Sequence, residues 1–347
     1  MPGMRIAIIS PYSTGPQRGN ITTVSRISRL LRQTGNEVLV LPADMFSTAE
    51  MERQLIPFAP ELIHGFHAHY CGELTRRLTE RFDTPFALTI TGSDVHNPQL
   101  RDHPNTIRAI GAAGAVVCFH ESEAAELVRY FPQAAKKITV IAQGVEILPV
   151  AAAENFGIAE DAFVLLLPAA FRPVKQIEFP LMALKSLADQ LPTLKLIIAG
   201  GIIDQDYAAT IRSQLDDAPF AQWLGEIRHE QMGALYTRAD VVINCSHSES
   251  MSNTLLEAMA LGRPVLANDI PGNRSLVRHG KTGMLYKDQE SFRQYVTWLA
   301  GNAGLRNVLG LRAAEYMRTS YSPEVEVAEH LRLYQVLIES SSNSGHL

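Results

Sequence analysis

Cysteine is scarce in this sequence, and long hydrophobic runs are missing from it. The three cysteines, Cys71, Cys118 and Cys245, are far apart and form no CxxC pair, which argues against a disulfide framework or a zinc knuckle. This cysteine usage fits a reducing compartment, so we expect a cytoplasmic protein. No apolar run approaches the length of a transmembrane helix, although peripheral contact with a membrane stays open. Only four consecutive apolar residues precede Ser10, too few for a signal peptide.

Charge of a single sign is also scarce. The net charge is −5 and no long run of like charges occurs, which argues against a nucleic-acid-binding protein. With 46% hydrophobic and 19% charged residues the composition is that of a globular protein, and 347 residues suffice for two domains.

Short apolar runs alternate with helical patterns in two successive series. The first begins with RIAIIS and EVLVLP, and the second begins with AFVLLLPAAF after a less regular linker over residues 145–161. Such alternation is typical of parallel sheets covered by helices. We therefore predict two doubly wound α/β domains, residues 1–150 and 151–322, with a ligand cleft between them. A final helix over about 323–339 can pack back on the first domain.

The most informative segment contains Glu249 and Glu257. VVIN predicts a buried strand, SHSESMSN a polar loop, and TLLEAMALG a helix that stops at Gly262. Glu249 is thus expected in a loop after a strand and Glu257 on the next helix. Because the N–H groups of a helix start attract anions, this arrangement suits a sugar attached to a phosphate.

These patterns resemble glycosyltransferase family 4, over nearly the whole chain. GNITT, QGVE, FRPVK, LGEI, ANDIPGN and the Glu-x7-Glu segment carry the resemblance. It implies the GT-B fold, two Rossmann-like domains facing each other across a cleft. It also implies a retaining glycosyltransferase that moves a hexosyl or N-acetylhexosaminyl group from a nucleotide-diphosphate sugar, here a UDP-sugar, to a small-molecule or lipid-linked acceptor. No cofactor and no metal are implied.

The resemblance also assigns roles to residues of the second domain. Glu257 would bind the ribose hydroxyls and Glu249 the hydroxyls of the transferred sugar, since a carboxylate accepts hydrogen bonds from neighbouring hydroxyls. Arg172 and Lys175 would stabilise the negative charge that grows on the diphosphate. Further donor-binding residues are expected in three loops: Gly19; Gly225 and Ile227; Ser250, Met251, Ser252, Asn253 and Thr254.

Several positions depart from the family pattern. Ser250 and Gln176 stand where many relatives have glycine, and Asn20 follows Gly19 where a second glycine is common. On the acceptor side, Thr91 stands where relatives often have histidine. Asp94 is then our catalytic candidate there, orienting or deprotonating the acceptor, with capping of a turn as the alternative.

Two further patterns suggest metal binding only superficially. His64, His67 and His69 have the spacing HxxHxH, but no cluster of carboxylates or cysteines follows. We expect these histidines to be structural or to line a cleft. Asp204 and Asp206 form a DxD pair, which we interpret as solvated charge because such pairs arise readily by chance.

Two other functions stay open. The first is carbon–selenium or carbon–sulfur bond formation, as in the neighbouring selenosugar synthases, for which a cation such as Arg18 would serve an anionic acceptor. The second is a non-catalytic sensor of sugar nucleotides. The joint presence of Arg172, Lys175, Glu249 and Glu257 argues against the sensor.

Overall fold

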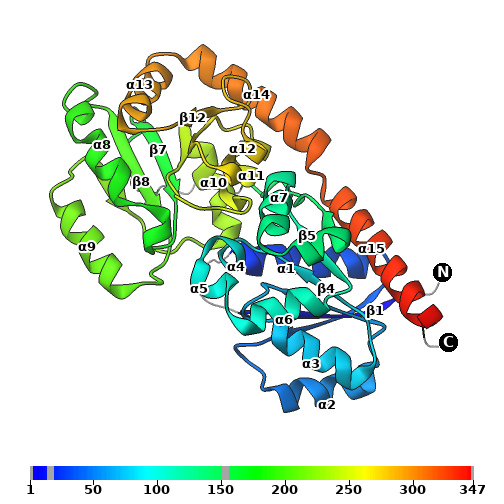
Figure 1. Cartoon of the computed structure of the whole chain (residues 1–347). Coiled ribbons are helices and arrows are strands. Elements are labelled where there is room, and N and C mark those ends of the chain that lie inside the picture. Colours follow the sequence, from blue (N-terminus) through cyan, green and yellow to red (C-terminus); the bar gives the residue numbers. More distant parts are fainter. Residues whose placement is uncertain (1–2, 14–18, 151–155, 345–347) are drawn as a thin grey trace. The chain divides into compact units, whose positions relative to one another are not determined.

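The computed structural model describes residues 3–13, 19–150 and 156–344. The chain divides into two compact units (Figure 1): the first comprises residues 1–144 and 321–347, the second residues 145–320. The boundary that we expected after residue 150 therefore falls inside the second unit.

The first unit is built on a six-stranded sheet in the order β2-β1-β3-β4-β5-β6. All pairings between its strands are parallel. The chain changes direction across the sheet between β1 and β3, which are neighbours although β2 separates them in sequence. The strands are β1 (Arg5–Ser10), β2 (Glu37–Pro42), β3 (Leu62–Phe66), β4 (Phe86–Thr89), β5 (Ala115–Cys118) and β6 (Ile138–Val140).

Helices cover both faces of this sheet because successive residues of a strand point to opposite faces and are apolar on both. In β1, Ile6 and Ile8 pack on one face with α1 and α15, while Ala7 and Ile9 pack on the other with α2, α3, α6 and α7. The helices are α1 (Gly19–Gln33), α2 (Thr48–Phe58), α3 (Gly72–Phe82), α4 (Ser93–His96), α5 (Pro98–Arg101), α6 (Pro104–Ala112), α7 (Glu121–Tyr130), η1 (Pro132–Lys137) and α15 (Pro323–Ser344).

The C-terminal helix α15 lies beside α1 in the first unit (Figure 1). Arg26 of α1 donates two hydrogen bonds to Glu326 of α15, at 2.9 and 2.8 Å, and both side chains are buried. The helix continues to Ser344, beyond the predicted end near residue 339. Serine hydroxyls in this last part donate hydrogen bonds to backbone carbonyls one turn earlier, as Ser342 does to Ile338. These serines are therefore compatible with a continuing helix.

The second unit has a six-stranded parallel sheet in the order β12-β11-β10-β7-β8-β9. Read from the other edge, this is the strand order 3-2-1-4-5-6 of doubly wound sheets, and its change of direction falls between β7 and β10. The strands are β7 (Phe163–Pro168), β8 (Leu194–Ala199), β9 (Ala221–Trp223), β10 (Val241–Asn244), β11 (Val265–Asn268) and β12 (Met284–Tyr286).

The helices of the second unit pack on a core that contains Leu165, Leu196 and Ile243. They are η2 (Pro173–Lys175), α8 (Glu178–Ala188), α9 (Gln205–Asp216), α10 (His229–Arg238), α11 (Asn253–Ala260), α12 (Pro271–Leu276), α13 (Gln289–Ala300) and α14 (Ala303–Ser320). Asp204 caps α9 by accepting a hydrogen bond from the N–H of Tyr207, and Asp206 is exposed in its first turn. The DxD pair is thus part of a helix start.

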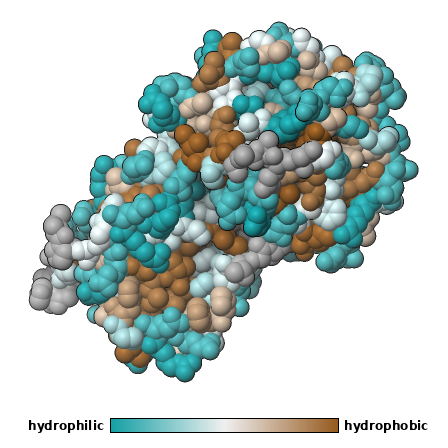
Figure 2. Space-filling view, turned by 180° about the vertical axis from the view of Figure 1, so that it is seen from behind, coloured by the Kyte–Doolittle hydropathy of each residue, from teal (hydrophilic) through white to brown (hydrophobic). Residues whose placement is uncertain are grey.

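Polar residues cover much of the face shown in Figure 2, and separate hydrophobic patches interrupt them. Across the described residues, no helix combines the length and apolar character needed to span a membrane.

Candidate functional site

Glu249 lies in the loop that joins β10 to α11. All four residues of β10 are buried, and Ser252 caps α11 by accepting a hydrogen bond from the N–H of Leu255. The loop packs tightly against Gly272 of α12, because a Cβ there would lie 2.1 Å from the carbonyl oxygen of Glu249. Only glycine allows this approach, which explains its presence in IPGN.

The carboxylate of Glu249 is held by three side chains, which all contact Oε1. Lys175 Nζ lies at 2.5 Å, Ser246 Oγ at 2.7 Å and Asn244 Nδ2 at 3.3 Å. Burial alone would raise the pKa of this carboxyl. The charge and hydrogen bond of Lys175, the Ser246 hydroxyl and the nearby Arg172 guanidinium outweigh burial and lower the pKa of Glu249 below its ordinary value. Glu249 is therefore an anion fixed in one orientation.

Three asparagines, which the sequence analysis did not single out, fix the same loop. Asn244 donates to both Glu249 and Ser252, and its Oδ1 accepts from Asn273 at 3.1 Å. Asn268 donates to the carbonyl of Ser246 at 3.0 Å. Asn244 and Asn268 end the strands VVIN and VLAN, and an amide that closes a buried strand needs hydrogen-bond partners. An asparagine at the end of each of these strands was the feature of the sequence from which this network could have been predicted.

Arg172 precedes the short helix η2, which follows β7, and Lys175 is the last residue of that helix. The next residue, Gln176, has φ 46°, in the left-handed region that favours glycine. Glutamine here therefore adopts a backbone conformation that glycine would adopt at lower cost. Arg172 Nε is buried and has no hydrogen-bond partner among the described residues. A buried donor without a partner is rare in proteins, which marks this arginine as a candidate ligand contact.

Glu257 lies on α11, where both its oxygens are bound. His229 Nε2 donates to Oε1 at 2.9 Å, and the hydroxyl of Tyr236 donates to Oε2 at 2.8 Å. The hydrogen bond to Glu257 raises the pKa of His229, against the effect of burial. Both partners lie on α10, and neither had been predicted from the sequence.

The remaining donor-side candidates lie in two loops of the second unit. Gly225 follows β9 with φ 78°, and no atom lies near the position of a Cβ, so glycine is favoured here by its backbone conformation. Ile227, two residues on, is half-buried. Ser250 lies outside the left-handed region, so serine replaces glycine without backbone strain. The other members of this loop are buried or half-buried: Met251, Ser252, Asn253 and Thr254.

Gly19 and Asp94 belong to the first unit. Gly19 is the first residue of α1. Arg18, proposed for an anionic acceptor, lies outside the described residues.

Asp94 has a different environment from the one expected of a catalytic base. It is fully buried and accepts hydrogen bonds from the N–H groups of Ala68, Thr91 and Gly92. A carboxylate occupied by three backbone donors has little capacity left for an acceptor hydroxyl. The structure thus gives Asp94 the capping role that the sequence allowed, and the catalytic assignment is corrected.

The histidines of the first unit do not converge on one point. His64 is fully buried between the hydroxyls of Tyr334 and Thr89, at 2.6 and 2.7 Å. Nowhere in the described part of the chain do three or more His, Cys, Asp or Glu side chains form a group that could hold a metal ion.

The two sheets together define a GT-B protein, a fold shared with solved structures over most of their length. The chain matches sucrose-phosphate synthase from Thermosynechococcus elongatus with a TM-score of 0.83, 19% identity and coverage of 96% of this chain and 99% of that one. It matches HepE from Anabaena, solved with UDP and glucose, with a TM-score of 0.80, 17% identity and coverage of 96% and 100%.

Sequence comparison defines the family. Residues 150–316, most of the second unit, match the family described as glycosyl transferases group 1, and this part of the chain belongs to that family. Glycosyltransferase 1 domain-containing protein 1 from Xenopus tropicalis is 26% identical over 344 residues, which cover 95% of this chain and 96% of that protein. D-inositol 3-phosphate glycosyltransferase from Thermobispora bispora is 30% identical over 270 residues, which cover 70% of this chain and 63% of that protein.

Proposed function

We propose that this protein is a retaining, metal-independent glycosyltransferase that moves a sugar from a UDP-sugar to a small-molecule or lipid-linked acceptor. The observation that carries the proposal is the group formed by Arg172, Lys175 and Glu249. It lies where β7 and β10 end, at the change of direction of the second sheet, which is where open α/β sheets bind their ligands. The structures of HepE with UDP and glucose support the choice of nucleotide.

The two carboxylates of this site would divide the donor between them. Glu249 is anchored through Oε1, so its Oε2 is the natural acceptor for a sugar hydroxyl. Glu257 would accept hydrogen bonds from the ribose. Because His229 and Tyr236 already hold its oxygens, its orientation is set before the nucleotide arrives.

The two cations would promote departure of the nucleoside diphosphate. The bond between Lys175 and Glu249 leaves further N–H donors of the ammonium for a phosphate oxygen. Arg172 contributes the buried Nε without a partner among the described residues. As the glycosidic bond breaks, negative charge grows on the phosphate, and fixed cations stabilise it without reorganisation. We assign no enzyme nucleophile, and the donor phosphate itself would take the acceptor proton.

Binding and turnover can be tested separately. A thermal-shift screen with UDP-, GDP- and ADP-sugars should show stabilisation by the UDP-sugar, since a ligand that binds the native state raises its stability. Glu257→Gln should weaken UDP binding in calorimetry, whereas Glu290→Gln on the exposed start of α13 should not. Indifference to all three nucleotides would remove the proposal, and undiminished UDP binding by Glu257→Gln would remove the ribose role.

A further inference from the structure

Five rings gather where β1 and β3 end in the first unit. The ring centroid of Tyr70 lies 6.1 Å from that of Tyr12, 4.2 Å from that of His67 and 5.2 Å from that of His69. The ring centroids of His69 and His103 are 4.8 Å apart. We call these five residues the ring cluster. Their contacts join segments that are far apart in sequence, so the cluster forms only in the folded unit.

The position of the ring cluster matches that of the donor residues in the other unit. Tyr12 follows β1, while His67, His69 and Tyr70 follow β3. β1 and β3 are the neighbouring strands at which the first sheet changes direction, and ligands of open α/β sheets bind beyond the carboxyl ends of such strands. No residue of the proposed donor site belongs to this unit except Gly19.

The backbone beneath the ring cluster is held in place. His67 has φ 73°, an uncommon conformation for a residue with a side chain. Its Nε2 is hydrogen-bonded to Ser93 at 2.9 Å, and Asp94 binds the next N–H, that of Ala68, at 2.7 Å. Backbone strain that the surroundings maintain in this way is concentrated at functional sites.

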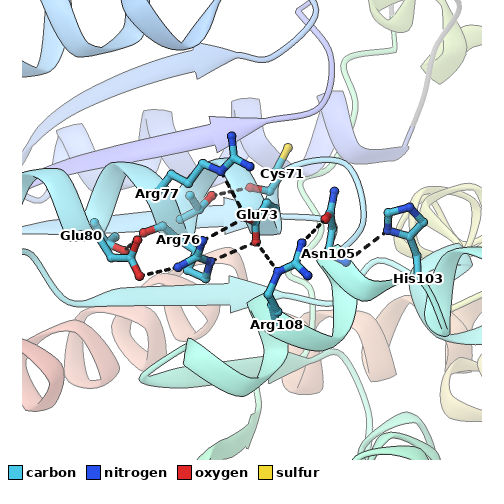
Figure 3. A network of polar contacts seen from close by, with 10 residues as sticks. Cys71, Glu73, Arg76, Arg77, Glu80, His103, Asn105 and Arg108 are labelled. Carbon is cyan, nitrogen blue, oxygen red and sulfur yellow. Dashed lines mark hydrogen bonds and ion pairs between the residues drawn. The ribbon is translucent and has the colours of Figure 1, made fainter.

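A network of polar contacts joins α3 to α6, the two helices next to the ring cluster (Figure 3). Glu73 at the start of α3 is bound by Arg76 at 3.0 Å and by Arg108 of α6 at 3.5 Å. Arg76, followed by Arg77 and Arg108, lowers the pKa of Glu73 to about 2 against the effect of burial. His103 caps α6, accepting from the N–H of Asn105 (Figure 3). The three arginines of this network, Arg76, Arg77 and Arg108, are therefore committed to ion pairs with Glu73.

The ring cluster has an exposed member, Tyr70, and none of its five residues is a lysine or an arginine. The side chain of Tyr70 is 47% exposed although three other rings contact it. Burial, with smaller contributions from neighbouring groups, lowers the pKa of His67 and of His69 below the ordinary value for histidine. Both imidazoles are thus neutral at pH 7. The nitrogens of His67 are bonded within the protein, Nε2 to Ser93 and Nδ1 to the N–H of Tyr70, so the half-buried His69 is the one of the two that can offer a nitrogen to a ligand.

We propose that the ring cluster binds the acceptor, and that the acceptor is an uncharged ring-shaped polyol, such as a sugar or cyclitol. This inference rests on the proposed transfer function. Aromatic faces carry partial negative charge and attract the C–H face of such a ring, while imidazole nitrogens and hydroxyls bind its hydroxyl groups. An anionic acceptor would instead need a lysine or an arginine, and none of the five residues of the cluster is one.

The test compares acceptors and variants in the full-length protein with UDP-glucose as donor. Acceptors are uncharged methyl glycosides and inositol, each beside its monophosphate. Tyr70→Ala should raise KM for the uncharged acceptor by about tenfold or more, and Tyr70→Phe should stay within about threefold of wild type because it retains the ring. Tyr130→Ala is the matched control, since Tyr130 is 37% exposed in the same unit but contacts Arg101.

Each outcome decides between the two proposals. Unchanged UDP binding and donor hydrolysis in Tyr70→Ala, together with the raised KM, would support the ring cluster. Donor hydrolysis without transfer to any uncharged polyol, a preference for the phosphorylated acceptors, or an unchanged KM in Tyr70→Ala would overturn it and leave the proposed function standing. Absence of both UDP binding and donor hydrolysis in the wild-type protein would overturn the proposed function itself.

Discussion

Both units contain a six-stranded sheet, but different kinds of side chain lie where each sheet changes direction. In the second unit, Arg172, Lys175 and Glu249 are charged groups that meet beyond β7 and β10. In the first unit, the equivalent place beyond β1 and β3 holds the ring cluster, which consists of histidines and tyrosines. A doubly wound sheet fixes where a ligand binds, and the loop side chains decide which ligand it is.

The carboxylates of the two units differ in the same sense. Glu249 is bound by side chains, so it is held as a group that can exchange partners with a ligand. Asp94 is bound by backbone N–H groups, so it belongs to the framework of its loops. One carboxylate serves binding and the other serves structure, although each follows a strand of a parallel sheet, Glu249 in the loop after β10 and Asp94 on the short helix after β4.

The largest effect is expected from Lys175→Met. It removes a fixed cation from the proposed leaving group, so kcat for transfer or donor hydrolysis should fall by about 10² to 10³-fold. Lys185→Met, an exposed lysine on α8 of the same unit, is the control and should leave kcat unchanged. Full activity of Lys175→Met would mean that the charged group is structural and that the units do not differ as proposed.

The next effect should come from Asp94→Asn and should appear in stability. Replacing the carboxylate removes charge-assisted hydrogen bonds to buried N–H groups, which lowers the free energy of unfolding by about 3 kcal/mol in urea denaturation. UDP binding, measured at a temperature where the variant is folded, should be retained. A loss of activity with unchanged stability would instead restore Asp94 as a catalytic base.

The sequence predicted the second unit better than the first for a physical reason. Glu249 and Glu257 are eight positions apart in one strand–loop–helix segment, so periodicity alone places both. The ring cluster, in contrast, joins Tyr12 to Tyr70 and His69 to His103, and nothing in local periodicity reports such contacts. Asp94 was misassigned for the same reason, because its partner Ala68 lies on another loop.

Two matched substitutions by glycine, one in each unit, should have smaller effects on stability and kinetics, and these effects should differ between the two units. Gln176 and His67 both have left-handed backbones, at φ 46° and 73°. Gln176→Gly relieves the strain and should change stability by no more than about 1 kcal/mol, with activity retained. His67→Gly relieves the same strain but removes a ring, so acceptor KM should rise. Equal kinetic behaviour of the two variants would show that His67 contributes only backbone geometry.

The smallest effect concerns the pH dependence of His229. Its hydrogen bond to Glu257 raises the folded-state pKa, so this contribution to stability is present below the unfolded pKa and is lost as pH rises through the folded pKa. The stability difference between wild type and His229→Gln should therefore be larger at about pH 5.5 than at about pH 8.5. Because the side chain is 40% exposed, the change should not exceed about 0.5 kcal/mol.

For His67→Gln in the first unit, the stability difference from wild type should change with pH in the opposite direction. Burial lowers the pKa of His67, so its contribution is present above the unfolded pKa and declines as pH falls toward the folded pKa. Urea denaturation of both variants across this range should give slopes of opposite sign. Slopes of the same sign would mean that the histidines of the two units are in similar electrostatic environments, which would contradict the contrast between a charged donor site and a neutral ring cluster.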